Sequence, residues 1–323
     1  MPDAAIGTMG RGVLRPDLAA TRFRLVRHRP SKPLAPFVDF YWILRWDLRG
    51  KPPHSQTVLP HPNVNLAFEA SGGGIFGVDR RLFTRSISGS GHALGVRFLA
   101  GGFRPFWQAP ISQLTDRVVP AARLFGPRAE KTRQAIMCGP GGSGASGASG
   151  GSGGSRGSAG SAGSGGSRGS GGSGDSGDSG DSGDSGDSED EADAWMIGCA
   201  EGLLCSVLPE RDRMVEQAAA LVSRITDDPG LRRVDELSAA SGMTARSLQR
   251  LFADYVGVSP KWVMRRARLH EAAERADGGD PVDWAWLAAD LGYADQAHLT
   301  RDFTATLGVS PARYAAPAAL LTS

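Results

Sequence analysis

Arg, Gln and Thr side chains stand near the start of two short segments in the last third of the chain. These residue types can read nucleic-acid bases, because Arg bridges guanine and Gln bridges adenine through paired hydrogen bonds in the major groove of DNA. The residues that share this potential face in the first segment are Ala245, Arg246, Gln249 and Arg250. Those in the second segment are Gln296, Ala297, Thr300 and Arg301. Base reading requires a helix that presents such a face, so the surrounding pattern decides their interpretation.

Both segments lie inside a repeated pattern. Leu237 and Gly242 are five positions apart, as are Leu287 and Gly292. Each copy continues to a Phe that stands five positions before a Gly, and that Gly opens the sequence Gly-Val-Ser-Pro. The pattern predicts a helix, a tight Gly turn, a second helix and a Ser-Pro stop, which is a helix-turn-helix written twice. The alternative is two ordinary helical hairpins whose polar faces are only solvated.

The second helix of each copy has a predicted cap and a predicted buried stripe. Thr244 is a good N-cap in the first copy, and Asp295 is its counterpart in the second. Apolar residues follow at helical spacing. The inward stripes are Leu248, Leu251, Phe252 and Tyr255 in the first copy and Leu299, Phe303 and Leu307 in the second. The polar residues named above therefore occupy the opposite, outward faces.

A helix that begins at Pro260 is expected between the two copies. Roughly 17 residues at 1.5 Å each make a rod of about 25 Å. Such a rod would hold the two recognition helices apart by something near one duplex turn of ~34 Å. The side chains expected to meet DNA phosphates are Thr244, Lys261, Arg265, Arg266 and His298.

From about Pro209 to Tyr314 the sequence resembles the DNA-binding domain of AraC/XylS-type bacterial transcription regulators. The resemblance rests on the repeated Leu-to-Gly and Phe-to-Gly-Val-Ser-Pro pattern described above. It also rests on Arg266-Ala267-Arg268-Leu269 and on the run from Leu291-Gly292-Tyr293 to His298-Leu299. It implies an all-helical domain with one recognition helix per half, both docking on one face of double-stranded DNA, and RNA polymerase as a partner. Family members often carry Lys or Arg after the second Phe, whereas Thr304 and Ala305 follow Phe303 here.

The charge distribution qualifies this interpretation. The formal net charge of the chain is +2, and residues 1–138 hold 20 Lys and Arg against 8 Asp and Glu. Residues 209–323 contain slightly more acidic than basic side chains, contrary to the usual footprint of a nucleic-acid binder. Their cations cluster on the predicted recognition and linker helices. We therefore expect modest non-specific affinity combined with local contacts to DNA.

Length and composition predict two domains, residues 1–208 and 209–323, because 323 residues with 40% apolar content suffice for two cores. No apolar run approaches the ~20 residues that cross a membrane, and the N-terminus lacks a signal pattern. Cys138, Cys199 and Cys205 show no CxxC spacing. A reduced, cytoplasmic protein without membrane contact is expected.

The N-terminal half is expected to be β-rich. Strands are predicted within Phe37–Leu44 and at 57–59, 64–68, 75–78, 82–87 and 94–99, followed by short helices at 104–107 and 111–114. A small barrel or sandwich fits this pattern, so the whole chain is assigned to an α+β multidomain class. Phe37-Val38, Tyr41-Trp42 and Gly95-Val96-Arg97-Phe98 resemble the cupin-like domains that precede AraC-type modules. Those domains often bind small effectors and dimerise, so an effector and a homodimer are implied.

Residues 139–190 form a Gly/Ser tract that ends in five Gly-Asp-Ser triplets from Gly174 to Ser188. It cannot bury apolar surface, so a disordered insert is predicted. Helices are expected on both sides, at Arg128–Cys138 and Glu191–Leu208. The tract is therefore interpreted as a large loop within the first domain, and the hinge between domains is placed near Pro209.

The alternative function is that of a metal-dependent cupin-type enzyme fused to a DNA-binding module. Its candidate ligands are His54, His61, His92 and Glu69. Cupin metal sites use His-x-His followed closely by Glu, whereas His54 and His61 are seven positions apart with prolines between them. Gly72-Gly73-Gly74 lacks a following helix start and is interpreted as a hairpin turn. We therefore expect no catalytic residue, no metal and no cofactor.

Overall fold

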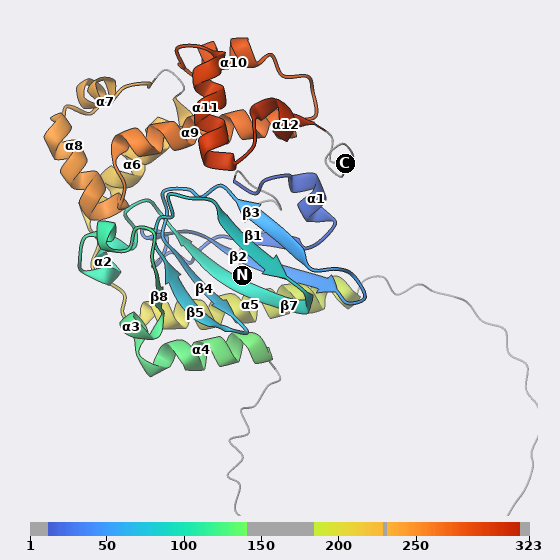
Figure 1. Cartoon of the computed structure of the whole chain (residues 1–323). Coiled ribbons are helices and arrows are strands. Elements are labelled where there is room, and N and C mark those ends of the chain that lie inside the picture. The colour runs from blue at the N-terminus through green and yellow to red at the C-terminus, as the bar shows by residue number, and fades with distance from the viewer. Residues whose placement is uncertain (1–11, 141–183, 229–230, 317–323) are drawn as a thin grey trace, which may run out of the picture.

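The computed structural model describes residues 12–140, 184–228 and 231–316 (Figure 1). The predicted insert lies mostly outside these described residues. Strands and a few helices make up the N-terminal domain, and helices alone make up the C-terminal domain. The α+β prediction is therefore confirmed. None of the helices among the described residues is long and apolar enough to cross a membrane.

Two antiparallel sheets build the N-terminal domain. The larger has the order β1-β2-β7-β4-β5-β8, and the smaller pairs β3 with β6. The strand bounds are β1 Arg24–His28, β2 Val38–Leu48, β3 His54–Val58, β4 Asn65–Glu69, β5 Gly72–Phe76, β6 Phe83–Ile87, β7 Gly89–Phe98 and β8 Val118–Pro120. The two edge strands, β1 and β8, were not predicted, because their short sequences carry little alternation.

The glycine run at Gly72–Gly74 is strand rather than turn, which corrects the sequence interpretation. A Cβ at Gly73 would lie 2.9 Å from the Phe68 ring, and Phe68 is fully buried on the neighbouring strand β4. Glycine is therefore used here for close approach of an aromatic ring to a strand.

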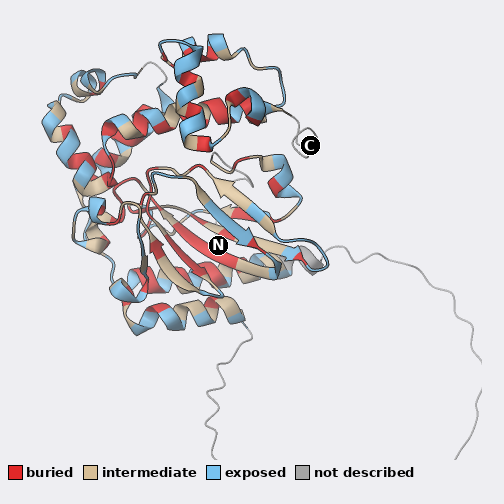
Figure 2. Cartoon of the chain, in the orientation of Figure 1, coloured by how far each residue is buried: buried red, intermediate tan, exposed pale blue. Residues whose placement is uncertain are grey.

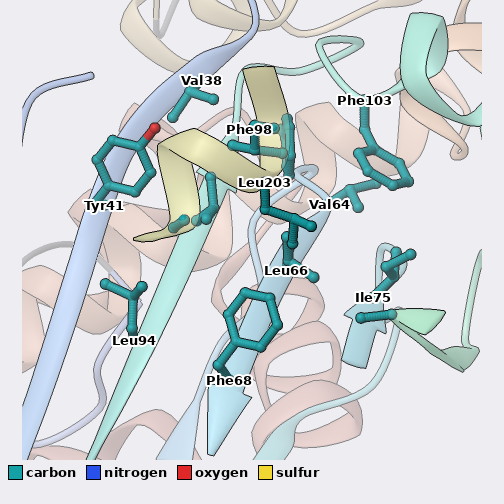
Figure 3. Packing of buried hydrophobic residues seen from close by; sticks show 14 of the residues in the cluster. Val38, Tyr41, Val64, Leu66, Phe68, Ile75, Leu94, Phe98, Phe103 and Leu203 are labelled. Carbon is teal, nitrogen blue, oxygen red and sulfur yellow. The ribbon is translucent and has the colours of Figure 1, made fainter. Parts of the chain in front are cut away.

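One face of the large sheet is covered by two helices, α4 (Pro127–Cys138) and α5 (Asp184–Cys205), which lie side by side beneath it in Figure 1. The core between sheet and helices includes Tyr41, Phe68, Leu94 and Leu203. Figure 3 shows Leu203 of α5 among side chains from the strands. Short elements close this core at one end: α2 (Arg104–Trp107), the 3-10 helix η1 (Ile111–Gln113) and α3 (Ala122–Phe125). A further short helix, α1 (Pro16–Ala20), precedes β1.

Helix α5 begins at Asp184, earlier than the predicted start at Glu191, so the last residues assigned to the insert are helical. Acidic residues in the first part of a helix are favoured by the helix dipole. Glu189 also forms an ion pair with Arg24 of β1. One turn later, Asp193 is buried, accepts a hydrogen bond from His28 Nε2 at 2.9 Å and pairs with Arg45. Burial opposes its ionisation, but these two partners hold the pKa of Asp193 below its usual range.

The C-terminal domain contains two hydrophobic cores, and one long helix contributes to both. The elements are α6 (Arg213–Asp227), α7 (Val234–Ser241), α8 (Ala245–Leu251), the π-helix η2 (Phe252–Val256), α9 (Pro260–Asp277), α10 (Trp284–Asp290), α11 (Gln296–Leu307) and α12 (Pro311–Ala315). Val263 and Met264 of α9 pack into the first core, and Leu269 and Ala273 pack into the second. The helices of this domain alternate buried and exposed stripes in Figure 2.

Replacing residues 141–183 with about twelve Gly and Ser residues should leave the melting temperature nearly unchanged, because the composition of this segment cannot contribute to a core. A flexible linker of that length spans roughly 20 Å, enough to connect two neighbouring helices. Thermal unfolding monitored by circular dichroism checks this. Extending the replacement to 190 removes Glu189 and the first turns of α5, and should lower the melting temperature. A large loss from the shorter replacement alone would contradict the loop interpretation.

Candidate nucleic-acid interface

The first helix-turn-helix consists of α7 and α8 joined at Gly242. Gly242 adopts a left-handed conformation, φ 67°, which lets the chain turn sharply after α7. The Thr244 side chain then accepts a hydrogen bond from the Ser247 backbone N–H at 3.2 Å, so Thr244 is the N-cap of α8. Leu248 and Leu251 are buried in the first core, as the helical spacing predicts. The face opposite this stripe is therefore turned away from the core.

That outward face carries the expected polar residues. Arg246, Gln249 and Arg250 are exposed, and Ala245 is half-buried beside them. Among the described residues none of the three long side chains has a hydrogen bond or ion pair, so each is available to an external partner. The geometry brings these residues together on one helix, and their contact with bases stays a prediction.

The second helix-turn-helix repeats the arrangement in α10 and α11. Asp283 caps α10 by accepting hydrogen bonds from two backbone N–H groups, and Asp295 caps α11 by accepting one from His298 N at 2.6 Å. Leu299 and Phe303 are fully buried, which sets the opposite face outward. On that face Gln296, Ala297 and Arg301 are exposed, Thr300 is half-buried, and His298 is exposed beside them.

The two copies differ where the recognition helix ends. The first continues from α8 into the π-helix η2, whose Gly257 N–H donates to Phe252 O at 2.7 Å, whereas α11 remains a regular helix to Leu307. The π-turn packs against η1 of the N-terminal domain, where Thr115 Oγ1 donates to Gly257 O at 2.6 Å. Tyr255, predicted to be core, is only half-buried. It lies at the edge of the first core, where the Arg104 guanidinium of the N-terminal domain lies 5.6 Å from the centroid of its ring and its hydroxyl donates to Asp212 of the helical domain at 2.6 Å.

Of the cations expected on α9, two are placed on its surface. Lys261 follows the helix-starting Pro260 and is exposed. Arg265 is also exposed, but its guanidinium pairs with Asp302 of α11. Asp302 in turn accepts a hydrogen bond from Tyr293 at 2.8 Å. Arg265 therefore ties α9 to the second recognition helix, and a phosphate would have to compete with Asp302 for it.

Arg266 is not at the surface, which corrects its placement among the phosphate contacts. Only 4% of this residue is exposed, its guanidinium donates to Arg80 O at 2.7 Å, and it stacks over the Trp262 ring at 4.6 Å. Burial, with a smaller effect of Arg265, lowers the pKa of Arg266 to about 10. Arg80 belongs to the N-terminal domain, so in this arrangement Arg266 joins the two domains and cannot reach DNA.

Further polar contacts join the N-terminal domain to both helix-turn-helix units. Arg104 Nε lies 2.8 Å from Asp254 Oδ1 of η2. Arg15 lies over the ring of Tyr314, whose hydroxyl donates to Asp277 at 3.0 Å. The rings of His61 and His270, on α9, stack with centroids 4.0 Å apart. Sequence reasoning missed these pairs, because their members are separated by 150 to 299 positions and carry no shared local pattern.

The four candidate metal ligands are not brought together. His54 contacts Gln56, His61 stacks on His270, His92 contacts Ile136 O, and Glu69 pairs with Arg85. Within residues 12–140, 184–228 and 231–316, no group of three or more His, Cys, Asp or Glu side chains is arranged to hold a metal ion.

Two family models match parts of the chain. Residues 237–316 match a family described as a helix-turn-helix domain, and this range includes both units described above. Residues 26–120 match a domain of unknown function, DUF6597, which spans most of the strands of the N-terminal domain.

Solved structures similar to the chain include three structures of ToxT from Vibrio cholerae, each 9% identical in sequence to this chain. An apo substitution variant covers 85% of this chain and 96% of its own, with a TM-score of 0.39. A wild-type form bound to an unsaturated fatty acid covers 98% and 96%, with a TM-score of 0.36. A third structure covers 91% and 98%, with a TM-score of 0.35. These scores are too low to transfer any property.

Replacing Arg266 with Ala should lower the free energy of unfolding by about 1–3 kcal/mol, because the Arg80 carbonyl loses its donor and the Trp262 ring loses its partner. Lys261→Ala is the matched control on the same helix, and we expect it to change stability little, since Lys261 is exposed. Urea unfolding of the two variants and the parent protein measures the difference. Equal losses in both would contradict the interface role of Arg266.

Proposed function

Taking as premise that this chain is a DNA-binding transcription regulator of the AraC/XylS type, we propose that one chain reads two successive major grooves. The chain belongs to this group by its C-terminal domain, which combines two complete helix-turn-helix units with the helix-turn-helix family match at 237–316. The observation that carries the proposal is that α8 and α11 both present exposed polar faces while α9 joins their cores.

The spacing supports two-groove reading. Helix α9 has 18 residues, so it is about 27 Å long at 1.5 Å per residue. Successive major-groove faces lie ~34 Å apart, and the recognition helices add their own offsets to the length of α9. Arg246 and Gln249 would read bases in one groove, and Gln296 and Thr300 in the next. Ala245, Arg250, Ala297 and Arg301 lie beside them on the same two faces.

Phosphate contacts are assigned to exposed residues at the edges of these faces. Lys261, Thr244 and His298 lie on the surface near the starts of α9, α8 and α11. Arg265 joins them only if its pairing with Asp302 is exchanged for a phosphate. Since cations do not follow Phe303, the second half has fewer phosphate contacts, and we expect its groove to be held less tightly.

The N-terminal domain is proposed to sense a small effector and to transmit its presence to the helical domain. Contacts already join this domain to η2, to α9 and to Tyr314 next to the second recognition unit. A ligand that shifts these contacts would change how the N-terminal domain lies against the helical domain, and with it the access of α8 and α11 to a two-groove operator. The domain boundary is placed at 208/209, between α5 and α6. RNA polymerase and a second copy of the chain remain predicted partners.

Alanine variants of the recognition helices should relax sequence preference one groove at a time. Arg246→Ala or Gln249→Ala should affect one patch of the operator, and Gln296→Ala or Thr300→Ala the other, at a cost of about 1–3 kcal/mol where Arg or Gln makes a bidentate contact. Selection of binding sites from random DNA, followed by footprinting, measures both patches, which we expect about 10 base pairs apart on one face. Arg275→Ala on the exposed C-terminal part of α9 is the control. Unchanged preferences in both patches would refute two-groove reading.

Removing a phosphate contact should act differently. Lys261→Ala should weaken binding to all sequences alike and reduce the slope of log affinity against log salt by about 0.9, because phosphates carry no sequence information. Titrations of operator and of unrelated DNA at several salt concentrations test this. Arg266→Ala, whose side chain is buried between the domains, should leave the slope unchanged. A reduced slope for Arg266→Ala would mean that the domains separate on DNA.

A further inference from the structure

A compact group of charged and aromatic side chains lies on the face of the large sheet that is turned away from α4 and α5. Arg27 of β1 is the register partner of Trp42, and Arg97 of β7 is the register partner of Phe40. Phe40 and Trp42 are two positions apart on β2, so all four side chains project to the same face. Together with Asp39 we call them the arginine patch.

The two guanidinium groups of the patch flank one aromatic ring. The Arg27 guanidinium lies 4.7 Å from the centroid of the Phe40 ring, and that of Arg97 lies 5.1 Å from it. Asp39 stands at an irregularity in the β2–β7 register, and its Oδ2 lies 3.2 Å from Arg97 Nε. One terminal nitrogen of Arg97 donates to Asn63 Oδ1 at 2.9 Å. The patch therefore contains two cations around one aromatic ring and one anion beside Arg97.

The hydrogen-bonding capacity of these arginines is not used up. The Nε atoms of Arg27 and Arg97 are both buried without a hydrogen-bond acceptor, because the Asp39 contact with Arg97 lacks hydrogen-bond geometry. In the part of the chain that the structure describes, Arg27 has no hydrogen bond or ion pair at all; its contacts are the Phe40 ring and the field of Asp39. Buried donors of this kind normally have partners.

The charge is also only partly compensated. Within the described residues, the charged groups that act on Arg27, Asp39 and Arg97 are these three alone. Burial is the largest influence on each: it lowers the pKa of Arg27, lowers the pKa of Arg97 to about 10, and raises the pKa of Asp39 despite both arginines. A second anion would lower the cost of keeping two guanidinium groups charged here.

We propose that the arginine patch binds the carboxylate of a small organic acid through the unpaired donors of Arg27, beside the Phe40 ring and the Arg97 guanidinium. The planar fork of a guanidinium matches a carboxylate through two parallel hydrogen bonds. The patch is reachable from solvent, since the side chains of Arg97 and Asp39 are 20% and 36% exposed. Two arginines and one aspartate leave one positive charge, which a monoanion neutralises.

The surroundings favour a carboxylate with an apolar body over inorganic phosphate. A phosphate dianion would exceed the single uncompensated charge and would be repelled by Asp39. Beside the guanidinium groups lie the flat rings of Phe40 and Trp42, and the Trp42 indole lies directly over Gly95, where a Cβ would overlap it. These rings can cover an apolar or aromatic group attached to the carboxylate.

The patch is connected to the helical domain through Asn63. This residue is buried, accepts from Arg97 and donates to Phe98 O at 2.7 Å. His61, two positions earlier, stacks on His270 of α9. The inference rests on the proposed function only in this respect: a ligand that repositions Arg97 would act on α9, the helix that joins the two DNA-reading units.

Calorimetric titration of the full chain with phenylacetate tests the site directly. We expect saturable binding with a dissociation constant of about 1 mM or tighter. Phenylacetamide, which is neutral and has the same shape, and inorganic phosphate should bind at least tenfold more weakly. Arg27→Gln should abolish phenylacetate binding, and Arg27→Lys should weaken it, because the charge remains but the fork is lost. Neither should unfold the protein, since Arg27 forms no hydrogen bond or ion pair among the described residues.

Arg24→Gln is the matched control. Arg24 lies on the same strand, but it pairs with Glu189 on the α5 side of the sheet, so this variant should keep parental binding. Absence of saturable binding up to about 10 mM phenylacetate would overturn the proposal. So would equal binding of phenylacetamide or phosphate, or unchanged binding by Arg27→Gln.

Failure of this site and failure of the proposed function can be told apart by a second measurement. Affinity for the selected operator is determined with and without phenylacetate. If the ligand binds but operator affinity does not change, the carboxylate site stands and its role as effector site is wrong. If phenylacetate does not bind while the chain still protects its operator, DNA reading stands and the carboxylate site is wrong.

Discussion

Helix α9 is the element on which the arrangement of this protein depends, because it supplies buried side chains to both cores of the helical domain. Val263 and Met264 belong to the first core, and Leu269 and Ala273 to the second. A helix this long is stiff, so the two recognition helices cannot change their separation without disturbing one of the cores. The length of α9 therefore sets the distance between α8 and α11.

The same helix is held from outside by the N-terminal domain. Arg266 donates to the Arg80 carbonyl, His270 stacks on His61, and η2 is tied to Arg104 and Thr115. Apolar packing joins the domains as well, because Leu14 and Leu59 belong to the second core of the helical domain and Val78 and Ala100 to the first. The polar contacts can be exchanged at moderate cost, whereas separation of the domains would also expose these apolar side chains. Asn63 connects the arginine patch to this interface, because it accepts a hydrogen bond from Arg97 and lies two positions after His61, which stacks on His270.

The arginine side chains of this protein differ widely in burial and in partners. Arg246 and Arg250 are exposed and without partners among the described residues, so their donors can meet bases. Arg27 and Arg97 are half-buried, and Asp39 is the carboxylate beside Arg97. The Nε atom of each arginine has no acceptor among the described residues, so an added anion could accept hydrogen bonds from them. Arg266 donates to a backbone carbonyl of the other domain and stacks on an aromatic ring, while its Nη1 has no hydrogen-bond partner among the described residues. Arginine thus occupies three environments in this protein, which differ in burial and in partners.

The sequence by itself determined the helical domain, because its signals are local: Thr244, Ser259, Asp295 and Ser310 cap helices with backbone groups a few residues away. The spacing of Leu and Phe residues identified the buried faces of α8 and α11, and the opposite faces of these helices were therefore expected to be exposed. Tertiary structure alone decided the rest. Arg266 belongs to a basic run that resembles a phosphate-binding face. Its guanidinium nevertheless donates to the backbone carbonyl of Arg80, 186 positions away in the sequence. Strand β1 became recognisable only through its pairing with β2, and Arg27 and Arg97 meet only because β2 lies between their strands. Such contacts depend on long-range pairing, which short-range periodicity does not encode.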